Sequence, residues 1–110
     1  MTAGIDLIAI ERQRQIEQEG WTPEHDDEHD DGTLIAAALS YAEVATEQAR
    51  PHFAGEDREW GTRIDWPWDA SWWKPSEEPI RNLMKAGALI AAEIDRLNRA
   101  VIGGAEEGTS

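Results

Sequence analysis

The pattern of apolar and polar positions predicts three helices separated by two irregular segments. Isoleucines near helical spacing, with charged and Gln residues between them, indicate a first helix from Ile5 to Glu19. They are Ile5, Ile8, Ile10 and Ile16. Gly20 follows as a C-terminal stop. The next segment, 21–32, is acidic and rich in turn residues, and Thr22-Pro23 indicates a short helical turn within it.

A broad apolar face predicts the second helix, which a side chain of Asp30 or Asp31 can cap. The apolar residues of this face are Leu34, Ile35, Ala38, Leu39, Tyr41, Ala42 and Ala45. The pattern continues through Gln48, and Pro51 ends it.

The third predicted helix starts near Pro79 or Ile80, with Ser76 as its candidate cap, and ends at Gly103-Gly104. Its apolar stripe consists of Leu83, Ala86, Gly87, Ile90, Ile94, Leu97 and Val101. Further apolar residues widen this stripe almost all round, so the helix must be buried against more than one neighbour. Four small residues, Ala86, Gly87, Ala88 and Ala91, would permit close helix approach. We therefore predict a subunit interface on this helix.

The segment from His52 to Pro79 has no convincing period and is interrupted by glycines and prolines. Irregular segments of this length inside a domain are usually functional or disordered, and its five tryptophans favour order. We expect an all-α, three-helix domain over residues 1–104 with a long, ordered Trp/Pro-rich loop. Residues 105–110 are predicted to form a flexible tail, and the C-terminal helix to mediate homo-oligomer formation.

The net charge of −13 excludes several classes of partner. No Lys or Arg occurs between Gln15 and Ala49, and such a surface repels nucleic acids and anionic membranes. The chain has no cysteine, and its longest apolar run, from Ala86 to Ala92, is too short to span a membrane. Its first ten residues lack a basic region typical of a signal peptide. We expect a cytoplasmic protein.

Tryptophans are the strongest candidates for ligand binding, because indole rings stack on planar groups and attract cations. Four of them lie within eight residues, and basic residues follow just downstream, where they could contact phosphates near a helix N-terminus. The predicted ligand-binding residues are Trp21, Trp66, Trp68, Trp72, Trp73, Lys74 and Arg81, with Trp60 and Lys85 as further candidates. The alternative is that these tryptophans form a satellite core that pins the loop to the helices.

The acidic segment from Glu24 to Gly32 contains His25 and His29, which would share one face of a helix. With adjacent carboxylates they could bind a divalent cation. The alternative is a solvated turn that caps a helix, and we include neither a metal nor a cofactor in the prediction.

Carboxylates on the predicted helices offer a second route to Mg²⁺ chemistry. They are Glu11 and Glu17, Glu43 and Glu47, and Glu93 and Asp95. We expect these side chains to be exposed to solvent. Since no nucleophile elbow, phosphate-binding loop or dinucleotide fingerprint occurs in the sequence, we assign no catalytic residue.

Several segments together resemble a family of small, mostly uncharacterised proteins of tailed phages and prophages. They are Glu11–Gln15, Glu19–Asp27, Trp66–Asp69, Trp72–Pro75 and Arg81–Ile90. The resemblance covers most of residues 8 to 99 and implies a viral origin rather than a reaction.

Two wider resemblances are shorter. The order of elements is similar to that of MazG-like all-α pyrophosphohydrolases, and Glu28 to Asp31 matches their Glu-x-x-Asp motif, but no Glu-Glu-x-x-Glu motif is present. Glu19-Gly20-Trp21 and Asp26-Asp27 resemble a short part of the ryanodine-receptor repeat domain.

The first functional hypothesis is a phage-encoded, non-catalytic protein that sequesters a nucleotide or a nucleotide-derived immune signal in a Trp-lined pocket. The second is a divergent, Mg²⁺-dependent nucleoside-triphosphate pyrophosphohydrolase. The third is an inhibitor that uses its acidic face to cover a basic surface of a host protein.

Overall fold

A computed structural model describes the backbone of residues 2–49 and 65–109, and the side chains of 2–48 and 65–101. Within these ranges the elements are α1 (Gly4–Glu19), α2 (Pro23–Asp27), α3 (Thr33–Ala49), the 3-10 helix η2 (Ala70–Trp72) and α4 (Pro79–Thr109). No strand occurs among the described residues. The predicted all-α class is confirmed, with one helix more than the three predicted.

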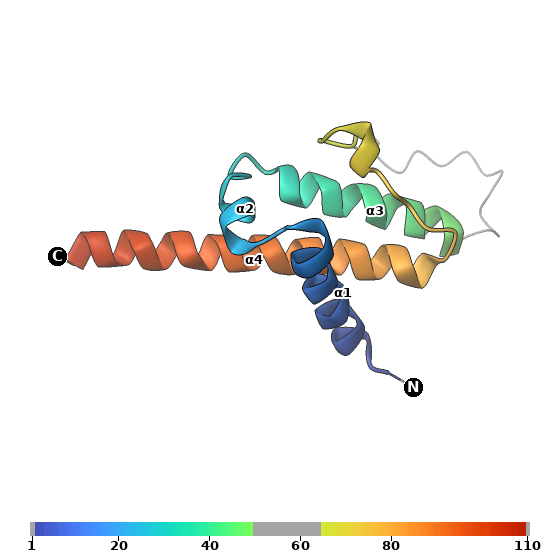
Figure 1. Ribbon diagram of the computed structural model, residues 1–110, viewed down its shortest axis with the longest axis horizontal. Coiled ribbons are helices and arrows are strands. Elements are labelled where there is room, and N and C mark those ends of the chain that lie inside the picture. The colour runs from blue at the N-terminus through green and yellow to red at the C-terminus, as the bar shows by residue number, and fades with distance from the viewer. Residues whose placement is uncertain (1, 50–64, 110) are drawn as a thin grey trace.

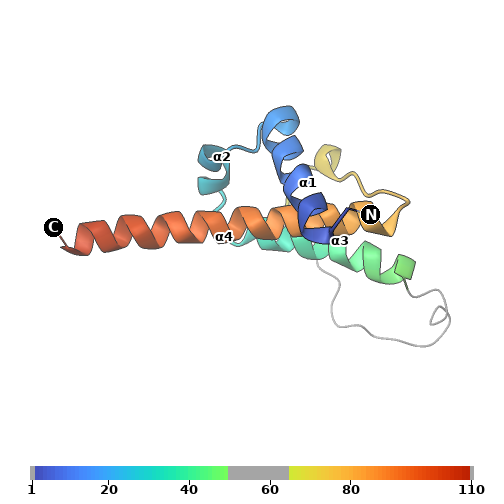
Figure 2. The same cartoon turned by 90° about the horizontal axis from the view of Figure 1, so that it is seen from below.

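The helix α4 is the axis of the fold, and the other helices pack on it. Figure 1 shows α3 running antiparallel along the first half of α4, whereas α1 crosses α4 steeply (Figure 2). The C-terminal part of α4 extends beyond the other helices in both views. No helix in the described ranges is long and apolar enough to cross a membrane.

The segment between α1 and α3 folds as its residues predict. Gly20 adopts a positive φ of 72°, and the next N–H, that of Trp21, donates to the carbonyl of Gln15 (3.0 Å), which ends α1. The Thr22 hydroxyl accepts the N–H of His25 (3.3 Å), so the predicted helical turn is the complete short helix α2. Asp31 accepts the N–H of Thr33 (3.2 Å) at the start of α3, as predicted for its cap.

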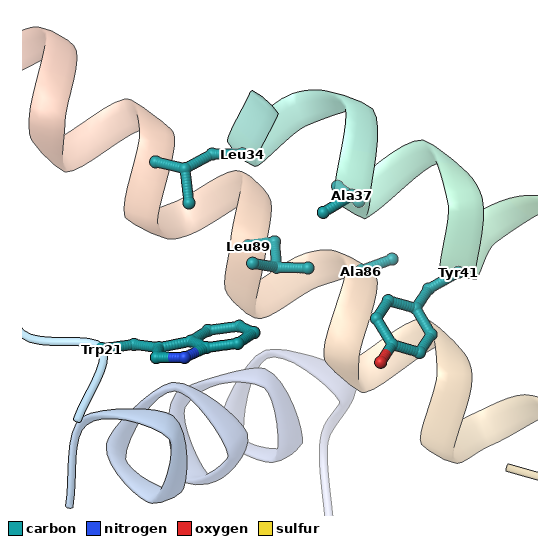
Figure 3. Packing of buried hydrophobic residues seen from close by; sticks show 7 residues of the cluster. Trp21, Leu34, Ala37, Tyr41, Ala86 and Leu89 are labelled. Atoms are coloured by element: carbon teal, nitrogen blue, oxygen red, sulfur yellow. The ribbon is translucent and has the colours of Figure 1, made fainter. Parts of the chain in front are cut away.

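The core lies between α3 and α4 and is closed at one side by Trp21. Figure 3 shows these residues, which are Trp21, Leu34, Ala37, Ala38, Tyr41, Ala86 and Leu89. Leu34 and Leu89 are fully buried, and the alanines between them let the two helices approach closely. The core is therefore built mainly of small residues with few large ones.

The predicted end of the third helix is wrong. The helix continues through Gly103 and Gly104 to Thr109. The small residues predicted for a subunit interface pack mostly inside the chain. Ala86 and Ala88 are buried, and a Cβ on Gly87 would lie 2.6 Å from Cδ1 of Ile8 in α1. They serve the approach of α3 and α1 to α4.

Candidate functional site

Three of the predicted tryptophans line a pocket of about 350 Å³ between the α1–α2 turn and the Trp-rich loop. Its lining residues are Glu19, Trp21, His25, His29, Trp68, Asp69 and Trp72. Trp21 is buried, Trp68 is half-buried and Trp72 is 41% exposed. The volume lies at the lower end of the range for small-molecule sites. We call this the Trp21 pocket.

Ring contacts hold the walls of the Trp21 pocket together. The centroid of Trp21 lies 5.5 Å from that of Trp68, nearly edge-on, and 6.2 Å from that of Trp72. Asp69 fixes the loop locally, because its carboxylate accepts the N–H of Ser71 (2.8 Å) and its carbonyl accepts the indole N–H of Trp66 (3.0 Å). The hydrogen bonds from the backbone N–H and the side chain of Ser71 lower the pKa of the Asp69 carboxyl.

The two histidines of the acidic segment meet in the wall of this pocket, as their spacing predicts. Their Nε2 atoms lie 3.4 Å apart, His25 stacks on Trp21 and His29 contacts Trp68. A hydrogen bond between two imidazole nitrogens needs one donor and one acceptor, so at least one ring is neutral. In the described part of the chain no group of three His, Asp or Glu side chains is placed to hold a metal ion. The pair contributes to the pocket wall rather than to a recognisable metal site.

One polar atom of the wall lacks a partner. The indole Nε1 of Trp68 is buried and has no acceptor among the described residues. Such a donor is costly to leave unsatisfied.

Trp66 and Trp73 lie outside the Trp21 pocket. Both pack on Tyr41, at 5.5 and 4.8 Å between ring centroids, and line a second pocket of about 340 Å³ with Ser40, Glu43, Val44, Asp65 and Pro75. Both also pack against the core. The predicted ligand-binding tryptophans are therefore divided between two pockets, Trp66 and Trp73 lining this second pocket and Trp72, which is 41% exposed, lining the Trp21 pocket. Trp60 lies outside the described residues.

The prediction that the helical carboxylates are exposed is wrong for Glu11 and Glu93. Glu11 is 0% exposed and pairs with Arg14 (2.8 Å) on α1 and with Arg81 (2.8 Å) on α4. Glu93 is also buried and pairs with Arg96. An Arg three residues after each Glu, Arg14 after Glu11 and Arg96 after Glu93, was the available sequence signal.

Glu11 keeps its charge in this environment. Burial by itself would raise the pKa of Glu11, but the hydrogen bond from Arg14 and the positive charges of Arg81 and Arg14 outweigh burial, so its pKa is lowered. The Glu11 carboxylate in turn raises the pKa of Arg14. Arg81, predicted to bind ligand, is therefore already engaged in an ion pair.

A group of four cations adjoins the Trp21 pocket. It consists of Arg14, Lys74, Arg81 and Lys85, and we call it the basic cluster. The Lys85 ammonium donates to the carbonyl of Lys74 (2.6 Å), and burial, followed by repulsion from Arg81, lowers the pKa of Lys85. Both lysines of the chain are in this group.

Two contacts connect the basic cluster to the pocket. Arg14 pairs with the pocket carboxylate Glu19 (3.2 Å), and the Lys74 ammonium lies 5.6 Å from the ring centroid of Trp72. A ligand against Trp72 would therefore have a cation beside it.

A further buried carboxylate, which the sequence analysis did not predict, supports the backbone beside the Trp21 pocket. Asp26 is 0% exposed and pairs with Arg12, whose guanidinium also donates to the carbonyl of Trp21 (3.0 Å). Arg12 thus fixes the backbone that carries Trp21.

No protein family, no curated protein and no solved structure matches this chain.

Proposed function

We propose that this protein binds a nucleotide-like small molecule in the Trp21 pocket and holds it without turnover. The observation that carries the proposal is the juxtaposition of three indole walls with the basic cluster. The sequence resemblance to phage proteins favours a sequestering role, in which a phage protein removes a nucleotide-derived signal of its host.

The walls of the pocket suit a planar heterocycle. Indole faces stack on any base, and such stacking contributes about 1–3 kcal/mol per base. Trp72 is 41% exposed and so has free ring surface to offer.

The basic cluster suits the anionic part of the same ligand. Among the described residues, its four cations form ion pairs with two carboxylates, those of Glu11 and Glu19. Lys74 and Lys85, which are not in those pairs, are the cations proposed to balance a phosphate. A pocket that instead recognised a cation would be expected to exclude lysines from its rim.

Sequestration is favoured over hydrolysis by the chemistry of the lining residues. Glu19 is paired with Arg14, and each of His25 and His29 lies against an indole ring and against the other. Glu28 and Asp31, which match the pyrophosphohydrolase spacing, are exposed on the turn before α3 and do not line the pocket.

Titration calorimetry and tryptophan fluorescence test the proposal against mononucleotides, cyclic dinucleotides and ADP-ribose species. We expect at least one of these to bind, and Trp72→Ala to weaken its binding by about 5- to 150-fold, the range that one stacked base implies. Trp72→Phe keeps an aromatic face and should retain most of the affinity. If no compound gives heat, or if Trp72→Ala binds like the wild type, the proposal is wrong.

The anionic subsite has its own matched pair of variants. Lys85→Gln removes a charge from the basic cluster, and Arg99→Gln removes one from the same helix about 21 Å further along. We expect the first to weaken nucleotide binding about tenfold and the second to leave it unchanged. Equal effects would contradict a local role of the cluster.

A further inference from the structure

The helix α4 carries a stripe of large apolar residues that the core does not cover. They are Ile80, Leu83, Ile90, Ile94, Leu97 and Val101, and each is between 44% and 68% exposed. Together with Gly87 they are alternately three and four residues apart over more than five turns. This is the spacing of a coiled-coil seam.

The helix α1 divides this stripe. Ile8 of α1 sits on Gly87, where a side chain would clash with it, so the crossing point of the two helices is in the middle of the stripe. Beyond the crossing, the stretch from Ile90 to Val101 continues along α4 past α2, whose Asp27 pairs with Arg99. We call this stretch the C-terminal stripe.

We propose that the C-terminal stripe is the interface between two copies of this chain. An alternating spacing of three and four is self-complementary, because each apolar residue of one helix fits between four residues of an identical helix. The residues beside the stripe are small or uncharged, namely Ala91, Asn98 and Ala100, so a second helix can come close.

Charge favours a second copy over other occupants. Between Ile90 and Val101 the two acidic and two basic residues cancel, although the whole chain has a net charge of −13. Both basic residues are engaged within the chain, Arg96 with Glu93 and Arg99 with Asp27 (2.7 Å). This neutral stretch is where two acidic copies repel each other least, and both of its basic residues are already paired within the chain.

The exposed apolar area of the C-terminal stripe is also large enough for an association site. Four large residues, each about half exposed, make a contiguous apolar patch of a few hundred Å², the size that marks an association site on a soluble protein.

Sedimentation velocity on the full chain tests the proposal. We expect the wild type to sediment as a dimer at tens of micromolar, and Ile94→Glu to raise the dissociation constant at least about 100-fold, because it buries an unpaired charge from each copy. Ile94 is 53% exposed in the single chain, so the variant should keep its helical circular dichroism. Leu39→Glu, at a 42% exposed position on α3, is the matched control and should stay dimeric.

A monomeric wild type would overturn the proposal, as would an Ile94→Glu protein that stays dimeric or a Leu39→Glu protein that dissociates equally. None of these outcomes depends on a ligand. Nucleotide binding can be measured on the monomeric variant, so the two proposals fail separately.

Discussion

Replacement of the buried carboxylate of Glu11 is expected to destabilise the fold more than loss of any other single charge on α1. The side chain is fully buried, and its oxygens accept from Arg14 at 2.8 and 2.9 Å. They also contact Arg81 at 2.8 Å and Gln15 at 3.3 Å. Because Arg81 lies on α4, this group of contacts holds α1 against the axis of the fold.

The expected loss of stability follows from the guanidinium groups that Glu11→Gln leaves unpaired. Breaking a buried ion pair by removing one partner costs about 3–5 kcal/mol, because a charge remains buried and unpaired. Here the remaining guanidinium groups are 25% and 34% exposed, so water can solvate them in part. We therefore expect a loss of about 2–3 kcal/mol. For a domain of this size that lowers the midpoint of thermal unfolding by roughly 10–20 °C.

Urea and thermal unfolding followed by circular dichroism measure this loss. Arg81→Gln should cost less than Glu11→Gln, since the carboxylate keeps Arg14, and the double variant should show a coupling energy of about 1–2 kcal/mol. Glu17→Gln, an exposed position on the same helix, is the control and should stay within about 0.5 kcal/mol of the wild type. If Glu11→Gln unfolds like this control, or if the coupling energy is zero, the ion pair does not stabilise the fold and the reasoning fails.

Three further predictions concern stability. The folded-state pKa of Glu11 is lowered below its ordinary value of 4.5, so its stabilisation is present above about pH 4.5 and is lost as the pH falls through the lower, folded value. Denaturant titrations at a series of acidic pH values should show this loss in the wild type and less of it in Glu11→Gln. Gly87→Ala should cost about 1 kcal/mol because the new Cβ meets Ile8, yet it should stabilise an Ile8→Ala background, where alanine's better helix propensity remains; equal effects in both backgrounds would contradict the contact. Leu89→Ala, at a fully buried position, should cost about 2–5 kcal/mol in chemical unfolding, and a loss below 1 kcal/mol would place Leu89 outside the core.

The helices could be predicted well because their signals are local. The isoleucine spacing and Gly20 predict α1 to within one residue, and the capping residue and apolar face predict α3 similarly. The end of α4 could not be predicted in this way. Gly103 and Gly104 lower helix stability by about 1 kcal/mol each but do not forbid helical dihedral angles, and the helix passes through them.

The site could be predicted only in part, because burial depends on residues far apart in the chain. The pairing of His25 with His29 is local and was predictable, whereas Glu11 is buried by an arginine that follows 70 residues later, at position 81. The sequence singles out the tryptophans as a group, and their role as ligand-binding residues stays a prediction. Their division into core rings, such as Trp73, and an exposed ring, Trp72, depends on how the loop folds back on α3.

The basic cluster explains how a protein with a net charge of −13 could bind the proposed anionic ligand. At physiological ionic strength, exposed charges more than about 8 Å apart are largely screened, so the many surface carboxylates act weakly at the pocket. What acts there is the local balance of four cations against Glu11, Glu19 and the pocket-lining Asp69. The ion pair between Glu11 and Arg81 thus has two consequences, since it fixes α1 on α4 and sets how much positive charge remains beside Trp72. A lysine is more readily available to a phosphate than a paired arginine, and the two lysines of the chain both lie in this cluster. This makes Lys74 and Lys85, rather than the predicted Arg81, the residues on which recognition of an anion should depend.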